Sequence, residues 1–398
     1  MSIKEEFKKG LNRNIIFLGI VSGLTDISSE MLYPIVPIFL TSVLNAPMSV
    51  VGLIEGIAES TASFIKIYGG RLSDKFARRK PFVVGGYSLS ALSKPLMAFA
   101  LSWHFVLFAR FIDRVGKGLR TSARDALISQ STPNEHWGKA FGFHRAMDTL
   151  GAALGPLLAL ILLKFMGEGA YRQIFIIAFI PAVLGVIVLL YFVKEQTSAP
   201  APAKSIGSFL GFSEMSNEFK IFTAFYLLFS LGNSSDAFLI LKTKSLGFST
   251  SAVIFVYFTY NIVYASLATP AGWLADRFGK LNSLIFGLVI FSCVYFFFGF
   301  NQSKTAVWFL FAFYGFYGAF SEGIYKAIIA QISPEQKRAT AMGLFQGLLG
   351  FMLFLSSFTA GIIWDKLGSA YPFYFGSITA LLSALLLFIW SRARKLSI

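Results

Sequence analysis

The chain contains the stretch Gly70-Arg71-Leu72-Ser73-Asp74-Lys75-Phe76-Ala77-Arg78 and, 202 residues later, a copy of it, Gly272-Trp273-Leu274-Ala275-Asp276-Arg277-Phe278-Gly279-Lys280. Each copy follows a long apolar run. A second pair of segments repeats at an offset of 201 residues, with the same four residue types at Gln130, Pro133, Ala140 and Gly142 and at Gln331, Pro334, Ala341 and Gly343. The sequence therefore predicts two homologous halves, each built in the same way.

The composition predicts that these halves lie in a membrane. Of 398 residues, 55% are hydrophobic and only 14% are charged, and the mean hydropathy is +0.66. A soluble domain carries about 25% charged residues, so a soluble enzyme with a membrane anchor is a poor fit, as is a disordered chain. The one cysteine and three scattered histidines give neither a disulfide framework nor a metal centre. No metal and no cofactor are expected.

Apolar runs of about 20 residues or more predict an all-α membrane protein with twelve helices. Their expected ranges are 14–43, 49–72, 81–100, 103–129, 138–164, 171–193, 220–246, 250–274, 281–300, 304–331, 338–364 and 370–391. We expect the chain to divide into a six-helix half, 1–193, a linker, 194–219, and a second six-helix half, 220–398. The linker contains alternating proline and alanine, which cannot continue a helix.

Basic residues gather on alternate connections, including both termini, the linker and the two repeated loops. By the positive-inside rule, both termini are expected in the cytoplasm and the protein in the cytoplasmic (inner) membrane. The first 13 residues have mixed charge and lead directly into the first run, so no cleavable signal peptide is expected. The same rule explains the net charge of +15, and no nucleic acid partner is expected.

With its two repeated loops, the whole chain resembles the major facilitator superfamily. The family signature G-x-x-x-D-[RK]-x-G-[RK]-[RK] is matched by Gly70, Asp74, Lys75, Arg78 and Arg79, although Ala77 replaces a glycine. The second copy keeps Gly272, Asp276, Arg277, Gly279 and Lys280. The resemblance implies two pseudo-symmetric halves that alternate access, with these loops as a conformational latch. The simpler alternative is a solvated turn whose charges only set topology.

The predicted fifth helix carries Gly142-x8-Gly151-x3-Gly155-Pro156. It resembles the antiporter signature of the drug:proton exporters in this superfamily, but Ala159 and Leu160 replace its last two glycines. Close packing of small residues, which is common in membrane helices, is the competing interpretation. The segment Pro34-Ile35-Val36-Pro37 resembles a further, shorter motif of the same exporters.

Ionisable groups inside the membrane are costly, so each is a functional hypothesis. A rise of about 1.5 Å per residue, counted from the end at which each helix enters the membrane, places these groups in two layers of the bilayer. The outer layer holds Glu30, Glu55 and Arg110, and the layer near the middle holds Asp26, Glu59, Asp113 and Arg114. Lys117 extends the basic stripe of the fourth helix, and Asp148 lies near the middle of the fifth. Carboxylates of the first two helices are thus able to face cations of the fourth.

Two interpretations of these charges stay open. One is a salt-bridge network that only locks helices together. The other is proton coupling by one or more of six carboxylates: Asp26, Glu30, Glu55, Glu59, Asp113 and Asp148. Asp26 is the first candidate, with Arg110 and Arg114 as its expected partners.

The second half has fewer charges and more aromatic residues. The expected substrate-binding residues there are Asp236, Tyr257, Tyr260, Tyr314 and Glu322. An aromatic wall opposite an ionic half would suit an amphipathic substrate, although tyrosines at these positions are also common as packing residues.

The favoured function is a proton-coupled antiporter, active in multidrug efflux, that exports small amphipathic compounds by alternating access. The alternative is transport of an anionic metabolite on Arg110, Arg114 and Lys117. No nucleophile–base pair, metal cluster or phosphate loop predicts an enzyme. A non-transporting sensor on the same scaffold remains open. The resemblance implies a monomer.

Overall fold

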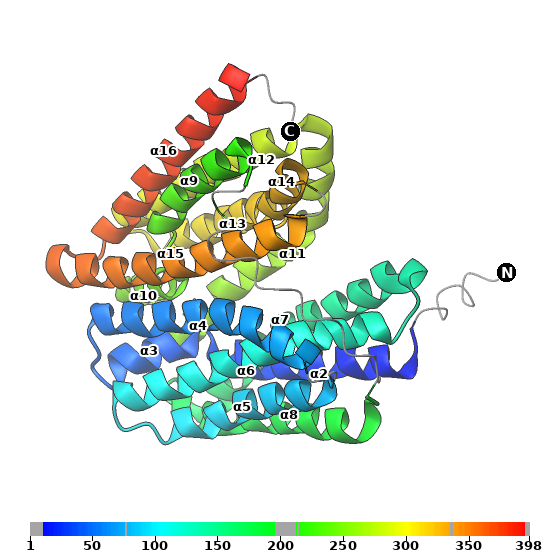
Figure 1. Ribbon diagram of the computed structural model, residues 1–398. Helices are drawn as coiled ribbons and strands as arrows, with labels where there is room; N and C mark the ends of the chain where they lie inside the picture. The colour runs from blue at the N-terminus through cyan, green and yellow to red at the C-terminus, as the bar shows by residue number, and fades with distance from the viewer. Residues whose placement is uncertain (1–10, 76–77, 196–211, 213–214, 335–336, 395–398) are drawn as a thin grey trace. The chain divides into compact units, whose positions relative to one another are not determined.

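The computed structural model describes residues 11–75, 78–195, 212, 215–334 and 337–394, and every regular element in these ranges is a helix (Figure 1). In chain order they are α2 (Arg13–Leu32), α3 (Ile35–Ser42), α4 (Met48–Lys75), α5 (Lys80–Ala98), α6 (Trp103–Gln130), η1 (Asn134–His136), α7 (Trp137–Met166), α8 (Tyr171–Phe192), α9 (Asn217–Gly232), α10 (Ala237–Ser245), α11 (Thr250–Phe278), α12 (Lys280–Phe300), α13 (Lys304–Ser321), α14 (Ile324–Ile332), α15 (Arg338–Leu367) and α16 (Tyr371–Arg394).

All twelve predicted spans are helical, which confirms the fold class. The two halves repeat the same order: α2 with α3 corresponds to α9 with α10, α4 to α11, α5 to α12, α6 to α13 with α14, α7 to α15, and α8 to α16. Their first helices are even capped alike. The side chain of Asn12 caps α2 and donates to the Ser131 carbonyl, and the side chain of Ser216 caps α9 and donates to the Ile332 carbonyl. Ser131 and Ile332 are separated by the repeat offset of 201 residues.

Three spans are interrupted, where continuous helices were expected. The first breaks before α3 at Pro34, which has no amide hydrogen to donate. The seventh breaks between Asn233 and Asp236, and the tenth breaks at Glu322 and Gly323. The breaks in the first and seventh spans correspond between the two halves, whereas the fourth span, the counterpart of the tenth, is one continuous helix. Interrupted helices are typical of transporter binding regions, because they free polar backbone groups inside the membrane.

Within the described ranges, nine helical segments are long and apolar enough to cross a bilayer. The three predicted spans outside this set are α5, α6 and α13 with α14. These helices carry the buried lysine and serines of α5, the charged residues of α6 and the tyrosines of α13. Their low hydropathy therefore reflects polar faces turned toward protein rather than toward lipid.

The chain divides into two compact units. Unit 1 comprises Met1–Phe39 and Thr61–Lys204, and unit 2 comprises Leu40–Ser60 and Ser205–Ile398. The first turns of α4 thus belong to unit 2 and its remainder to unit 1. The boundaries 1–193, 194–219 and 220–398 remain a prediction, and most of the linker lies outside the described residues.

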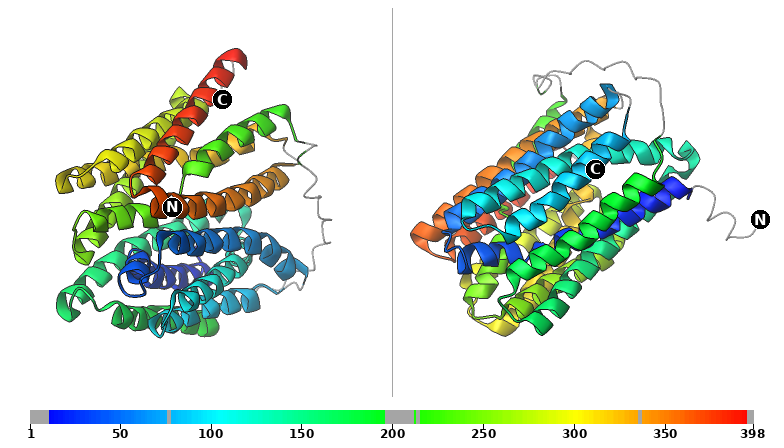
Figure 2. Two further views of the ribbon diagram at one scale, coloured as in Figure 1. Left: turned by 90° about the vertical axis from the view of Figure 1, so that its left-hand side faces the viewer. Right: turned by 90° about the horizontal axis from the view of Figure 1, so that it is seen from below.

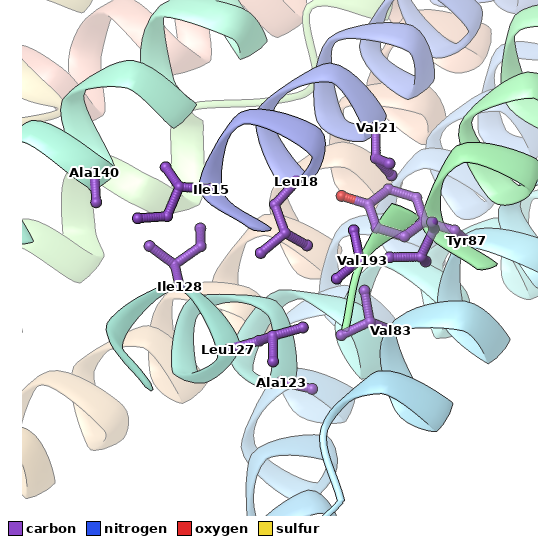
Figure 3. Close-up of a cluster of buried hydrophobic side chains, with 11 residues drawn as sticks. Ile15, Leu18, Val21, Val83, Tyr87, Ala123, Leu127, Ile128, Ala140 and Val193 are labelled. Carbon is purple, nitrogen blue, oxygen red and sulfur yellow. The ribbon is translucent and has the colours of Figure 1, made fainter. Parts of the chain in front are cut away.

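The core of unit 1 joins its helices at one end. Ile15, Leu18 and Val21 of α2 meet side chains of α5, α6, α7 and α8, with Tyr87 of α5 among them (Figure 3). Figure 2 shows α2 running beside α8, as their contacts require. This packing fixes α2, and with it the acidic residues further along that helix.

Candidate functional site

The two motif glycines of α7 hold the acidic face of α2. A Cβ atom added to Gly151 would lie 2.5 Å from the Gly23 carbonyl oxygen and 2.9 Å from the Asp26 Cβ. One added to Gly155 would lie 2.8 Å from the Glu30 Cβ. Larger residues would push the helices apart, so the glycines bring the α7 backbone against the two carboxylate-bearing positions.

The remaining motif residues behave differently. Gly142 has no heavy atom within 4 Å of an added Cβ in the described structure, so it takes no part in this contact. Pro156 is buried inside a continuous α7. The glycine motif therefore acts through Gly151 and Gly155, and its role here is close packing at an acidic site. The resemblance to the antiporter signature and the close packing of small residues are thus compatible interpretations of this motif.

Asp26 has charged neighbours on two helices. Asp148 of α7 and the cations Lys117, Arg120 and Arg124 of α6 lie within electrostatic range of its carboxylate. Arg110 and Arg114, the partners expected from the sequence, are not its main cations. The expected pairing is therefore corrected: the main cations near Asp26 lie further along α6, at Lys117, Arg120 and Arg124.

The reason for this shift is the register of the two helices. Asn12 and Asn14, at the beginning of α2, both hydrogen-bond Ser131 just after α6, which fixes these two ends at one level. Asp26 is thirteen residues from the first residue of α2, and Lys117 is thirteen residues from the last residue of α6. Both helices rise by about 1.5 Å per residue, so these two residues share a level. Counting from the opposite end of the long α6 misplaced its cations.

Asp113 pairs with a lysine that the sequence analysis did not consider. The Lys94 ammonium of α5 lies 2.9 Å from Asp113 Oδ1, and both side chains are almost completely buried. Gly86 and Gly116 let the two helix backbones touch at this crossing. Arg114 lies beside the same carboxylate, 3.9 Å from its other oxygen. Asp113 thus belongs to an α5–α6 ion pair, and the expected proton-coupling role remains a prediction.

The polar crossing of α5 and α6 extends by one turn. Arg120 donates to the Ser90 hydroxyl and places its guanidinium over the Tyr87 ring, 4.6 Å from the ring centre. Ser90 in turn donates to the Asp113 carbonyl. On α5, Ser93 and Lys94 follow Ser90 by three and four residues, so all three side chains share one face of the helix. This spacing is the signal in the sequence that points to the polar crossing.

Asp148 pairs with the one buried histidine of the described structure. His144 Nδ1 lies 3.5 Å from Asp148 Oδ2, one turn apart on α7. Arg124 and Asp125 of α6 lie within electrostatic range of the same histidine. Arg145, three residues before Asp148 in the sequence, is exposed. His144 was missed because a single histidine in a sequence carries no pattern.

In unit 2, the predicted substrate residues come together on α11 and α13. Tyr314 donates a 2.7 Å hydrogen bond to Asp236 Oδ1, at the break between α9 and α10. The Tyr260 ring packs 5.0 Å from that of Tyr314 and 5.6 Å from that of Tyr257. All three tyrosines are buried. They form a connected aromatic cluster around one carboxylate.

Three further carboxylates of unit 2 lie within electrostatic range of Asp236, namely Glu322, Glu59 and Glu55. Glu322 accepts a 3.0 Å hydrogen bond from the Tyr264 hydroxyl. Glu55 is buried and Glu59 partly so, on the segment of α4 that belongs to unit 2. The expected contact of Glu55 and Glu59 with the cations of α6 therefore stays a prediction, since α6 lies in unit 1.

Of the two latch loops, the second is described in detail. Asp276 and Lys280 lie 3.5 Å apart, and Arg277 stacks over the Trp273 and Phe278 rings. Gly279 has a φ of 94°, a conformation that suits glycine. In the first loop, the last turns of α4 contain Gly70, Asp74 and Lys75, whose side chains the structure does not describe. Arg78, which follows, is exposed.

Comparisons with known proteins agree with this architecture. The model of the Major Facilitator Superfamily matches residues 18–243 and 222–397. An uncharacterized MFS-type transporter of Methanocaldococcus jannaschii is 37% identical over 391 residues, 96% of each chain. The multidrug resistance protein MdtH of Aeromonas hydrophila is 25% identical over 338 residues, covering 82% of this chain and 81% of that one.

Among solved structures, the crystal structure of a mutant of the nucleoside transporter NupG has the same fold. Its TM-score is 0.79 at 14% identity, and the match covers 96% of this chain and 99% of that one. The match to the family model spans almost the whole sequence, and the described helices repeat as this fold requires. The chain therefore belongs to the major facilitator superfamily, whose members are multi-pass membrane transport proteins for small molecules and not enzymes.

Proposed function

We propose that this protein is a proton-coupled antiporter that exports small amphipathic compounds from the cytoplasm by alternating access. It lies in the cytoplasmic (inner) membrane, has both termini in the cytoplasm and works as a monomer. Protons and a small-molecule substrate are its ligands, and the two repeated loops latch its conformations. The observation that carries the proposal is the position of Asp26 between α7 and the cations of α6.

Asp26 has the surroundings that proton exchange requires. A half-buried carboxylate favours its proton when a second carboxylate is near and releases it when cations approach. Asp148 is the second carboxylate near Asp26, and the cations within electrostatic range are Lys117, Arg120 and Arg124. Small movements of α2 against α6 or α7 would therefore change its affinity for a proton. Glu30, one turn away on the same face, is a second carboxylate of this kind.

The aromatic cluster of unit 2 supports a substrate with both an apolar surface and a positive charge. Tyrosine faces attract cations, and Asp236 and Glu322 add negative charge at the rim of the cluster. The name of the distant relative MdtH, a multidrug resistance protein, is in line with such a substrate. Tyr257, Tyr260 and Tyr314 would supply the apolar contacts.

Transport of an anionic metabolite is the second candidate, because Arg110 and Arg114 are buried in unit 1. Two observations weigh against it. Arg114 already lies 3.9 Å from Asp113, and Lys117 lies within range of Asp26. An anion would have to compete with these carboxylates for the stripe.

The test uses purified protein in liposomes with an imposed pH gradient. A panel of cationic dyes and organic anions is added, and proton and substrate fluxes are measured together. The proposal expects a cationic amphipathic substrate to move against a proton flux, with Asp236→Asn weakening its binding.

Two results would decide against it. Flux of an organic anion that is lost in Arg110→Gln would establish the second candidate. A substrate flux that does not depend on the pH gradient would exclude proton coupling.

A further inference from the structure

We propose that His144 and Asp148 form a proton relay that connects Asp26 to the end of the α2–α7 pair where α7 begins. The inference rests on the proposed proton coupling and adds to it a residue, His144, and a path. His144 is the residue through which the proton held by Asp26 leaves the membrane interior.

The path follows one face of α7. Trp137 begins the helix, His144 lies two turns further, Asp148 one turn beyond it, and Gly151 then contacts Asp26. The residues are spaced four and three apart, so their side chains share the face that packs on α2. His144 and Asp148 thus lie on one face of α7, between the end where this helix begins and the candidate site at Asp26.

His144 and Asp148 form a dyad in which two buried atoms lack a hydrogen-bond partner within the described residues. These atoms are His144 Nε2 and Asp148 Oδ1. The dyad uses its other two atoms, Nδ1 and Oδ2, for the 3.5 Å contact. A buried polar atom without a partner is costly, and a histidine that only stabilised the fold would be expected to use both nitrogens. One open atom at each end of the pair is what a relay needs, because a proton enters at one and leaves at the other.

The charged groups around the dyad come from all three helices that meet there. α6 contributes Arg124 and Asp125, which pair with each other at 2.9 Å. α2 contributes Asp26, and its Ser22 hydroxyl accepts a 3.4 Å hydrogen bond from Arg124. α7 itself adds Arg145.

The proposed relay starts from a neutral His144 ring whose hydrogen is on Nε2, so that Nδ1, the atom facing Asp148, is able to accept a proton. A ring that is neutral at rest and protonated only in passing transmits a proton without trapping it.

The transfer conserves protons and charge. Protonated Asp26 gives its proton to Oδ1 of the Asp148 carboxylate. Rotation of the Asp148 carboxyl group turns this O–H toward His144, and Nδ1 of the neutral ring accepts the proton. The imidazolium then loses the proton on Nε2 to a water molecule. The sum is one proton moved from Asp26 to water, and the neutral ring regains its starting tautomer by exchange with water. The 3.5 Å contact shortens during transfer, as hydrogen bonds of proton-transfer groups commonly do.

The test compares His144→Gln and Asp148→Asn with His104→Gln, an exposed histidine of the same unit. Export driven by a pH gradient should fall about 100-fold in the first two, the lower range for a positioned proton-transfer group. Exchange of labelled for unlabelled substrate at equal pH needs no net proton movement and should keep its rate. The double variant should be no slower than either single one, since both break one path.

A second measurement needs no change at the dyad. In the His104→Gln/His136→Gln protein, His144 is the only histidine. Its imidazole band in the infrared should change when substrate triggers proton release.

The outcomes separate the two proposals. Proton-driven export unchanged in His144→Gln but lost in Asp26→Asn would overturn the relay and leave the proposed function intact, as would a silent imidazole band. Absence of proton coupling in the unmodified protein would overturn both.

Discussion

At the scale of single residues, the buried pair of Lys94 and Asp113 illustrates what a sequence does and does not reveal. Asp113 stands out because a carboxylate in a membrane helix is costly. Lys94 lies in a predicted span too, and its spacing from Ser90 and Ser93 marks a polar face of α5 without saying which helix that face meets. Only the close crossing at Gly86 and Gly116 brings them to 2.9 Å.

Breaking this pair should destabilise the protein. Lys94→Met leaves the Asp113 carboxylate buried without its closest cation and should lower the free energy of unfolding by about 3–5 kcal/mol. Lys164→Met, at an exposed position, should change it by less than about 0.5 kcal/mol. Thermal unfolding of the purified proteins measures both, and equal unfolding midpoints for the two variants would contradict the structural role of the pair.

At the scale of helices, the contact of α2 with α7 sets the candidate site. The glycine spacing of α7 is visible in the sequence, and the acidic spacing of α2 is visible separately. Their relation is not, because it depends on which face of each helix is buried. Gly142 belongs to the motif, yet a Cβ atom added there would have no heavy atom within 4 Å in the described structure, so motif membership alone overstated its role.

This difference between glycines is testable. Gly151→Ala forces a methyl group against the Gly23 carbonyl and should destabilise the protein by about 1–3 kcal/mol and slow proton-coupled transport. Gly142→Ala meets open space and, with the better helix former, should be neutral or stabilising by up to about 1 kcal/mol. Unfolding and transport assays on both variants check this, and identical behaviour of the two variants would argue against close packing of α7 on α2 at Gly151.

A second contact between helices lies within unit 2. The Asp365 carboxylate near the end of α15 accepts hydrogen bonds from the amides of Met48 and Ser49, at 3.0 and 2.8 Å. Gly361 and Gly52 allow the two backbones to touch there. A carboxylate at a helix beginning satisfies free amides and the positive end of the helix dipole.

Removal of that carboxylate should loosen the first turn of α4. Asp365→Ala should lower the stability of this turn by about 0.5–2 kcal/mol, and Asp365→Asn by less, because one acceptor oxygen remains. Hydrogen–deuterium exchange of peptides covering residues 48–51 should be fastest in Asp365→Ala, slower in Asp365→Asn and slowest in the unmodified protein. Equal exchange in all three would show that the cap is dispensable.

At the scale of the whole molecule, the repeat accounts for most of what could be predicted. Twelve spans, their order and the family follow from hydrophobic lengths and the two repeated loops, since these depend only on local sequence. The breaks before α3, α10 and α14 were missed because hydropathy averages over them. The partners of Asp26 were misplaced because depth was counted from the wrong end of α6, whose 28 residues exceed the roughly 20 that a bilayer requires.

The central claim is that Asp26 exchanges a proton for substrate, and proton release from purified protein in weakly buffered detergent tests it most directly. Addition of a cationic amphipathic compound near neutral pH should release protons from the unmodified protein and none from Asp26→Asn. Asp26→Glu should retain release, and thermal unfolding should show that all three proteins are folded. Equal proton release from Asp26→Asn and the unmodified protein would contradict the claim.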